Sequence, residues 1–317
     1  MSLPVFLFQV LVPCLLLLWL ATSPAGGVLA FALQVLSVAA LLIALWLTAV
    51  WAMPPFWVPY LYGAAFVAIV VYHLARNRID LSSPWSAGAG ASVVIVLVAL
   101  AGAKGVQMTV LALQGRALPE VQTVDIAPPF GAGSYLVAHG GSSVMVNGHL
   151  RTLDPGEPEY HAWRGQSRAL DILRIKPSGF HVEGWRPADP ARYVTFGTPV
   201  LAPCDGRVAL AEDGLPDMQV PEMDSFNKPG NYVAIDCGGF YVILAHLRQG
   251  SVQVAAGEQV AAGDPVGEMG NSGNSSEPHL HLHAQRGLPP AAPLSGAPLG
   301  LTLHGRFPVR NDVIRVE

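Results

Sequence analysis

The chain has 317 residues, of which 51% are apolar, with a mean hydropathy of +0.41 and a formal net charge of −4. A chain of this length can hold one large domain or two ordinary ones. The negative net charge and the lack of any run of basic residues argue against a nucleic-acid partner.

Charge is distributed unevenly along the chain. Residues 1–75 contain no Asp, Glu, Lys or Arg, and the first charged residue is Arg76. Because a helix needs about 20 apolar residues to cross the hydrocarbon core of a bilayer, long uncharged runs predict membrane spans. We therefore expect a transmembrane region over residues 1–114 in a lipid bilayer, with helical spans at about 4–22, 27–52, 56–75 and 91–114.

Three details bear on these spans. The first has no basic segment before it and is followed at once by another apolar run, which favours a membrane helix over a cleaved signal peptide. Lys104 lies in the fourth span, so it must reach the interface, face the helix bundle or mark an earlier end. Arg76 and Arg78 lie between the third and fourth spans and predict that this loop is cytoplasmic. The fourth span then leads outward, so the rest of the chain is expected outside the cytoplasm.

The remainder of the sequence is typical of an antiparallel all-β domain. Residues 115–130 are interpreted as a linker and residues 131–317 as the domain. Short alternating or β-branched runs are separated by Gly, Pro and Asp, as in "GTPVLAP", "GRVALAE", "NYVAID" and "FYVILAHL". The irregular segment 212–230 is expected to be a surface loop that governs specificity.

Two of the three cysteines lie in this β domain. If "GRVALAE" and "NYVAID" pair as neighbouring antiparallel strands, Cys204 and Cys237 come close together. Outside the cytoplasm they could form a disulfide, and the alternative is two buried thiols. Cys14 lies in the first span and is expected only to pack there.

The sequence "PHLHLH" places histidines at alternate positions of an expected strand. Side chains two residues apart share a face, so His279, His281 and His283 would lie together. His246 ends another apolar strand, and Asp171 lies inside a third, where a carboxylate is costly to bury unless it is paired or bound to a metal. Two imidazoles and one carboxylate form a typical zinc ligand set that leaves the fourth position for water.

The segments "TFGTPVLAPCDGRVALAEDG", "AHLRQGSVQV" and "GEQVAAGDPVGEMGNSGNSSEPHLHLH" occur in the order seen in one family. Over about residues 130–290 the chain resembles the lysostaphin-type (LytM-like) zinc metallopeptidases, which cut peptidoglycan cross-bridges. The resemblance implies one Zn²⁺ per chain, with Asp171 and His281 as ligands. It also implies that His246 and His279 are catalytic, orienting the water, transferring protons and stabilising the oxyanion.

The first zinc ligand departs from the usual family pattern. Many members place this histidine four residues before the aspartate, where this chain has Ser167. We favour His149, in an Asn-Xaa-His element that some relatives share, with His161 as the alternative. His283 is expected to support its neighbours rather than to bind zinc. Structural or surface positions are expected for the remaining histidines, His73, His139, His181 and His304.

The expected function is that of a membrane-anchored zinc metallo-endopeptidase. It would use a zinc-activated water to hydrolyse peptide bonds in peptidoglycan stems or cross-bridges. The protein would be a multi-pass protein of the bacterial inner (cytoplasmic) membrane, with its catalytic domain on the extracytoplasmic side. The alternatives are an inactive relative that binds the cell wall or regulates another hydrolase, and a peptidase that acts on proteins.

Overall fold

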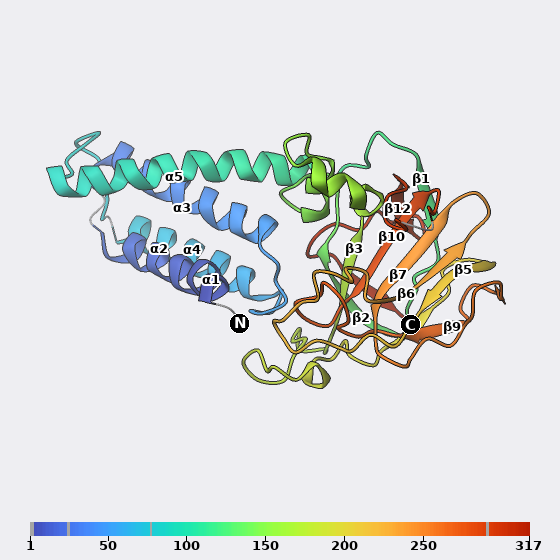
Figure 1. Ribbon diagram of the computed structural model, residues 1–317. Helices are drawn as coiled ribbons and strands as arrows, with labels where there is room; N and C mark the ends of the chain where they lie inside the picture. The colour runs from blue at the N-terminus through green and yellow to red at the C-terminus, as the bar shows by residue number, and fades with distance from the viewer. Residues whose placement is uncertain (1–2, 24–25, 77, 290–291) are drawn as a thin grey trace. The chain divides into compact units, whose positions relative to one another are not determined.

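The computed structural model describes residues 3–23, 26–76, 78–289 and 292–317 and divides the chain into two compact units. The first unit ends at Leu113 and the second begins at Gln114. The first is helical and the second is built on β-sheets (Figure 1). The predicted combination of an α-helical region and an antiparallel β domain is therefore confirmed.

Four helical segments of the first unit are long and apolar enough to cross a membrane. The first combines α1 (Leu3–Phe6), the π-helical turn η1 (Leu7–Leu11) and α2 (Val12–Thr22). The others are α3 (Val28–Thr48), α4 (Val58–Ala75) and α5 (Ala89–Gln114). Their bounds lie within a few residues of the four predicted spans, because long apolar runs determine both.

Small residues allow α5 to approach α3 closely. A Cβ atom added to Gly102 would lie 2.8 Å from the Cα atom of Ser37, so only glycine fits at this contact. Lys104 is exposed on α5 and donates a hydrogen bond of 2.7 Å to Oε1 of Gln107. Its side chain therefore does not face the interior of the helical unit.

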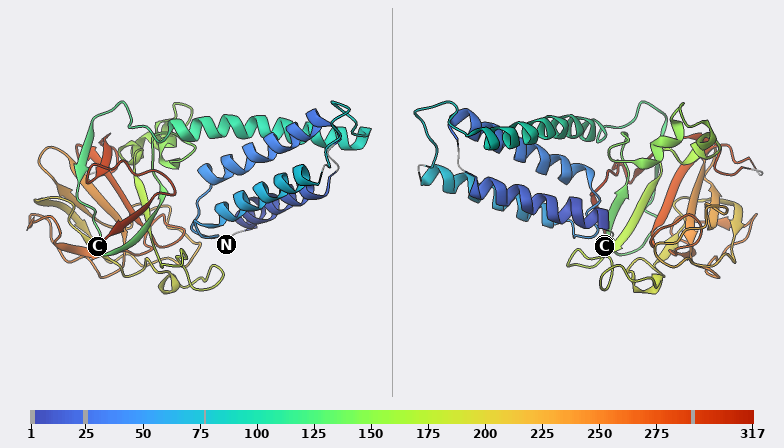
Figure 2. Two further views of the ribbon diagram at one scale, coloured as in Figure 1. Left: turned by 180° about the vertical axis from the view of Figure 1, so that it is seen from behind. Right: turned by 60° about the vertical axis from the view of Figure 1, so that its left-hand side comes forward.

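The second unit contains a nine-stranded sheet whose paired neighbours are antiparallel. Its strands lie side by side in all views (Figures 1 and 2). In spatial order they are β13 (Val313–Val316), β2 (Gly133–His139), β3 (Leu170–Ile175), β10 (Leu280–Arg286), β7 (Tyr241–Leu247), β6 (Asn231–Asp236), β5 (Gly206–Glu212) and β8 (Gln259–Val260), with β11 (Ala297–Pro298) paired to β10.

Two smaller sheets complete the unit. Strand β4 (Pro199–Leu201) pairs antiparallel with β9 (Pro265–Glu268). Strand β1 (Thr123–Ile126) pairs with β12 (Gly300–Leu303) and is parallel to it. Because β1 falls within residues 115–130, this part of the expected linker is integrated into the β domain. Four residues are too few for their alternation to indicate a strand.

The central strand β10 separates the core from the functional face. Leu280, Leu282 and Ala284 point into the main apolar core, whereas His281 and His283 lie on the opposite side. Three 3₁₀ helices lie outside the sheet: η2 (Gly148–Leu153), η3 (Pro158–Gln166) and η4 (Pro190–Arg192). Of these, η3 packs against β10 and so helps to bury its polar face.

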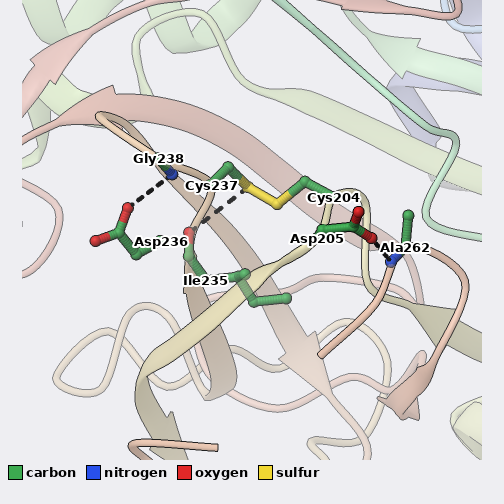
Figure 3. Close-up of a disulfide and its surroundings, with 7 residues drawn as sticks. All are labelled: Cys204, Asp205, Ile235, Asp236, Cys237, Gly238 and Ala262. Atoms are coloured by element: carbon green, nitrogen blue, oxygen red, sulfur yellow. Dashed lines mark hydrogen bonds between the residues drawn. A yellow bond between two sulfur atoms is a disulfide. The ribbon is translucent and has the colours of Figure 1, made fainter. Parts of the chain in front are cut away.

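Cys204 and Cys237 form a disulfide (Figure 3). The antiparallel register aligns Arg207 of β5 with Asp236 of β6, which brings the cysteines at these strand ends to a Cα–Cα distance of 5.9 Å. Of the two alternatives left open by the sequence, the structure has the disulfide.

We predict that the Cys204→Ser/Cys237→Ser double variant is less stable by about 3–4 kcal/mol, because the bridge closes a loop between residues 33 apart. Urea unfolding of the full chain in detergent, followed by near-ultraviolet circular dichroism, measures the difference. Cys14→Ser serves as the control because Cys14 is a free cysteine. Equal unfolding midpoints for the double variant and the wild type would contradict the prediction.

We also predict a pH-dependent contribution from Asp125 of β1. Hydrogen bonds from the Thr302 hydroxyl (2.6 Å) and the Gly305 amide (2.8 Å) lower the pKa of Asp125. A depressed pKa stabilises the fold above the unfolded value of about 3.9, and this stability is lost as the pH falls through the lower folded value.

Asp125→Ala should therefore cost at most about 1 kcal/mol near neutral pH, since the carboxylate is exposed and screened. The difference from wild type should shrink below about pH 4. Unfolding in urea across this pH range tests it, with the exposed Glu222→Ala as control. A difference that grows on acidification would show that the carboxylate charge is not the cause.

Candidate metal centre

Strand pairing places a carboxylate among histidines at the middle of the sheet. His281 of β10 lies opposite Asp171 of β3 on one side and Ala245 of β7 on the other. Oδ1 of Asp171 lies 3.0 Å from Nδ1 of His281 and 3.5 Å from Nε2 of His279. The three predicted residues Asp171, His279 and His281 are thus brought together, and Asp171 is only 9% exposed.

His149 reaches the same carboxylate from η2. Its Nε2 lies 3.5 Å from Oδ2 of Asp171, and its ring centroid lies 5.0 Å from that of His281. Its Nδ1 lies 3.0 Å from Oδ1 of Asn147, whose amide group donates to the Gly141 and Ala169 carbonyls. The Asn147 oxygen must therefore accept from Nδ1–H of His149, which leaves a lone pair on Nε2 facing Asp171.

His161, the alternative to His149, lies elsewhere. It is exposed on η3 and does not line the cavity beside Asp171. The Asn-Xaa-His element therefore has a physical role, since its asparagine orients its histidine. His161 belongs to a second 3₁₀ helix whose contribution to the cavity is made by other residues, Tyr160, Trp163 and Gln166.

His246 and His279 present the same ring nitrogen toward the site. Nδ1 of His246 lies 2.9 Å from the Ser272 carbonyl, and Nδ1 of His279 lies 2.8 Å from the Glu277 carbonyl. Each Nδ1 therefore carries a proton, and in the neutral ring each Nε2 carries a lone pair. The two ring centroids are 4.8 Å apart, so these lone pairs can serve one reacting centre.

The backbone of His246 is in an uncommon conformation. Its φ of +61° lies in the left-handed region, which costs a non-glycine residue about 1–3 kcal/mol. Its amide donates to the Pro229 carbonyl (3.0 Å) at the point where the register between β6 and β7 shifts. Such strain is typical of functional sites, where the surrounding structure compensates for it.

His139 also belongs to the cluster, although the sequence predicted only a structural or surface position for it. It ends β2 opposite Asp171. Its Nδ1 accepts hydrogen bonds from the Gly148 amide (3.1 Å) and the Arg310 guanidinium (3.1 Å), so Nε2 carries the proton. His139 thus supports the helix that presents His149. The signal that could have revealed it is the apolar run "YLVAH", which ends in histidine as "ILAH" does.

The other histidines have separate positions. His283 is 1% exposed and continues the row on β10. His181 lies 3.2 Å from Oε2 of Glu277, outside the central group. His73 is buried in α4 with Nε2 3.0 Å from the Leu20 carbonyl, and His304 is exposed after β12.

Electrostatics keep the carboxylate charged and several histidines neutral. Burial alone would raise the pKa of Asp171, but the adjacent His149 and His279 outweigh it and hold this pKa well below its usual value. Burial lowers the pKa of His149 to about 3 and that of His139 to about 4. Burial and the neighbouring His279 likewise lower the pKa of His246 well below 6.5.

A cavity of about 420 Å³ opens over these groups. Its walls come from η2, η3 and the loop that ends before β6, including Arg151, Met223 and Lys228. Nζ of Lys228 lies 4.1 Å from the centroid of the Trp163 ring. These two residues also line a neighbouring cavity of about 620 Å³, so an extended ligand could pass from one cavity to the other.

The donor atoms suit a zinc ion. The Asp171 carboxylate, Nε2 of His149 and Nδ1 of His281 supply one oxygen and two nitrogens at the floor of the cavity. Metal-sized groupings of donor atoms within 4.8 Å of one another occur among His246, His279 and His281 and among His139, His149 and Asp171. Because Nδ1 of His139 already accepts two hydrogen bonds, this residue is the poorest ligand of the group.

The site is a buried carboxylate surrounded by histidines on an antiparallel sheet. Comparison with known proteins relates this part of the chain to a class of metallopeptidases. Residues 192–293 match the model of Peptidase family M23. This part of the second unit is thus similar to M23 metallopeptidases, and the recognised resemblance to lysostaphin-type enzymes is confirmed. The matched region includes His246, His279 and His281, whereas His149 and Asp171 precede it.

Individual relatives agree with this assignment. The chain is 31% identical over 140 residues to peptidoglycan DD-endopeptidase ShyA of Vibrio cholerae, covering 43% of this chain and 28% of the relative. It is 30% identical over 122 residues to cell division protein DipM of Caulobacter vibrioides, covering 38% and 17%. The chain therefore spans less than a third of the length of either curated relative.

A solved structure of an M23 protein is also similar to part of the chain. The catalytic domain of the prophage-encoded M23 protein EnpA from Enterococcus faecalis has 23% sequence identity and a TM-score of 0.24. That match covers 36% of this chain and 76% of the EnpA chain.

We predict that His149→Ala weakens zinc binding at least about 100-fold, since losing even a supporting residue of a zinc site costs roughly 10–100-fold. His161→Ala should bind as the wild type does. Titration of the metal-free full chain in detergent against a chromophoric chelator measures both affinities. The reverse ranking would assign the ligand to His161.

Proposed function

We propose that this protein is a membrane-anchored zinc metallo-endopeptidase that hydrolyses peptide bonds in peptidoglycan stems or cross-bridges. The observation that carries the proposal is the convergence of His149, Asp171 and His281 beside two further histidines that present Nε2 to the same cavity. The M23 match and the printed name of the ShyA relative support the choice of peptidoglycan as substrate.

His149, Asp171 and His281 would hold one Zn²⁺. A bound zinc ion polarises the scissile carbonyl and lowers the pKa of a bound water to about 7. Asp171 is suited to be a metal ligand because a buried carboxylate must be neutralised by a partner. The imidazoles of His149 and His281 are suited to be metal ligands because each can direct a lone pair toward the ion.

His246 and His279 would handle the protons. Each has its Nδ1–H committed to a backbone carbonyl, so its Nε2 can accept a proton from the attacking water. Once protonated, the same atom can donate to the oxyanion or to the leaving amine. Their carbonyl partners fix both rings, which limits the reorganisation needed during the reaction.

The four apolar helices would anchor this unit to a bacterial inner membrane. Arg76 and Arg78, between the third and fourth helices, favour a cytoplasmic position for that loop. The Cys204–Cys237 disulfide independently supports an extracytoplasmic position for the peptidase unit, because such bonds persist in oxidising compartments.

We predict that the zinc-loaded full chain in detergent releases peptide fragments from purified sacculi. His279→Ala should retain zinc but react about 10²–10⁴-fold more slowly, the usual loss for a general acid–base group. Mass spectrometry of the released muropeptides gives the rate and the bond cleaved. The exposed His304→Ala is the matched histidine control.

Three outcomes separate the candidate functions. A wild-type rate for His279→Ala would contradict the catalytic assignment. A chain that binds zinc and sacculi but cleaves neither sacculi nor unfolded protein would instead support a non-catalytic wall-binding or regulatory module. Cleavage of unfolded protein alone would identify a peptidase that acts on proteins.

A further inference from the structure

The polar row on β10 continues beyond the metal centre. After His281 come His283 and Gln285, which are 1% and 0% exposed. Neither residue is part of the cavity wall, so neither is placed to contact a substrate there. Yet Nε2 of His281 lies 3.2 Å from Nδ1 of His283, and Nε2 of His283 lies 3.3 Å from Oε1 of Gln285.

The direction of these hydrogen bonds is determined at Gln285. Its amide nitrogen donates to the carbonyls of Gly287 (2.8 Å) and Pro293 (2.6 Å). Turning the amide over would place its oxygen against two carbonyl oxygens, which is electrostatically unfavourable. Oε1 of Gln285 must therefore be the atom that faces His283, and it can only accept.

Glycines make room for this glutamine. A Cβ atom added to Gly296 would lie 2.7 Å from Nε2 of Gln285, and one added to Gly165 would collide with Oε1. The side chain is thus confined between backbone segments on both sides. Its amide has little freedom to adopt another hydrogen-bonding pattern.

The acceptor at Gln285 determines the proton positions on the two histidines before it on β10. Because Oε1 of Gln285 accepts, His283 donates from Nε2 and keeps a lone pair on Nδ1. That lone pair accepts from His281, whose proton must lie on Nε2. A doubly protonated His283 would break this pattern, but among the described residues no carboxylate forms an ion pair with it.

The consequence of these proton positions concerns Nδ1 of His281. With the proton on Nε2, Nδ1 carries a lone pair and faces Oδ1 of Asp171 at 3.0 Å. Two lone pairs at this distance repel each other, and a cation bound by both removes the repulsion. We call this series of hydrogen bonds from His281 through His283 to Gln285 the relay. It favours the His281 tautomer that binds a metal over the tautomer that would donate a hydrogen bond to Asp171.

We infer that His283 and Gln285 are positioning residues that hold His281 as the Nε2–H tautomer, so that Nδ1 is available as a metal ligand. The inference rests on the proposed function only for the assignment of His281 as a ligand. It goes beyond a general supporting role because it specifies which atom carries each proton and requires an acceptor at position 283.

The test measures zinc affinity, and not activity, in the full chain in detergent. His283→Phe fills the space but accepts no hydrogen bond, and it should weaken zinc binding about 10–100-fold. His283→Asn can place its amide oxygen where Nδ1 lies, and it should bind within a few-fold of wild type. Unfolding of the metal-free variants in urea verifies that both remain folded.

A third variant tests the relay even if His283→Phe does not fold. Gln285→Met conserves size but removes the acceptor that orients His283, and it should also weaken zinc binding, by several-fold. His304→Ala again serves as an exposed histidine control.

The outcomes are distinct. Loss of affinity in both His283→Phe and Gln285→Met, with near-normal binding by His283→Asn, supports the relay. Wild-type affinity in Gln285→Met, or equal losses in His283→Asn and His283→Phe, would overturn it, since packing alone would then explain the row. A wild-type chain that binds no zinc would overturn the proposed metal site itself, and the relay with it.

Discussion

Asp171 is a carboxylate enclosed in the middle of a β-sheet, and the surrounding structure is arranged to satisfy that buried charge. Placing an ion in such surroundings costs several kcal/mol unless partners compensate for it. Strand β10, the segment just before it and helix η2 supply those partners as the imidazole rings of His281, His279 and His149, whose nitrogens face the Asp171 oxygens. Rings that could only donate would form an ordinary ion-pair network, whereas rings that present lone pairs create a site for a cation.

The second nitrogen of each ring determines which of these two sites is formed. For the four rings central to the account, this nitrogen is hydrogen-bonded to a neighbouring group, and the partners are Asn147, Ser272, Glu277 and His283. Each partner accepts, so each ring, when neutral, directs an unprotonated nitrogen inward. The outer hydrogen bonds and the buried carboxylate therefore act together. The hydrogen bonds orient the lone pairs, and the carboxylate charge favours a metal ion at the point toward which the lone pairs are directed.

Much of this architecture could be predicted because it depends on patterns within short segments. The absence of charge before Arg76 indicated the first three long apolar helices, and alternation in "HLHLH" indicated one polar face of a strand. Other parts depend on contacts between distant segments. His139 acts through the backbone amide of Gly148, which leaves no periodic trace in the sequence. Strand β1 depends on β12, far along the chain, and the choice of His149 over His161 depends on how two irregular 3₁₀ helices fold over the sheet.

The central claim is that one zinc ion is held by His149, Asp171 and His281. Anomalous diffraction at the zinc edge from crystals of the zinc-loaded full chain tests it most directly. We expect a single strong peak per chain within about 2.0–2.2 Å of Nε2 of His149, a carboxylate oxygen of Asp171 and Nδ1 of His281. A peak bound by His161, or one coordinated by His246 and His279 without Asp171, would contradict it.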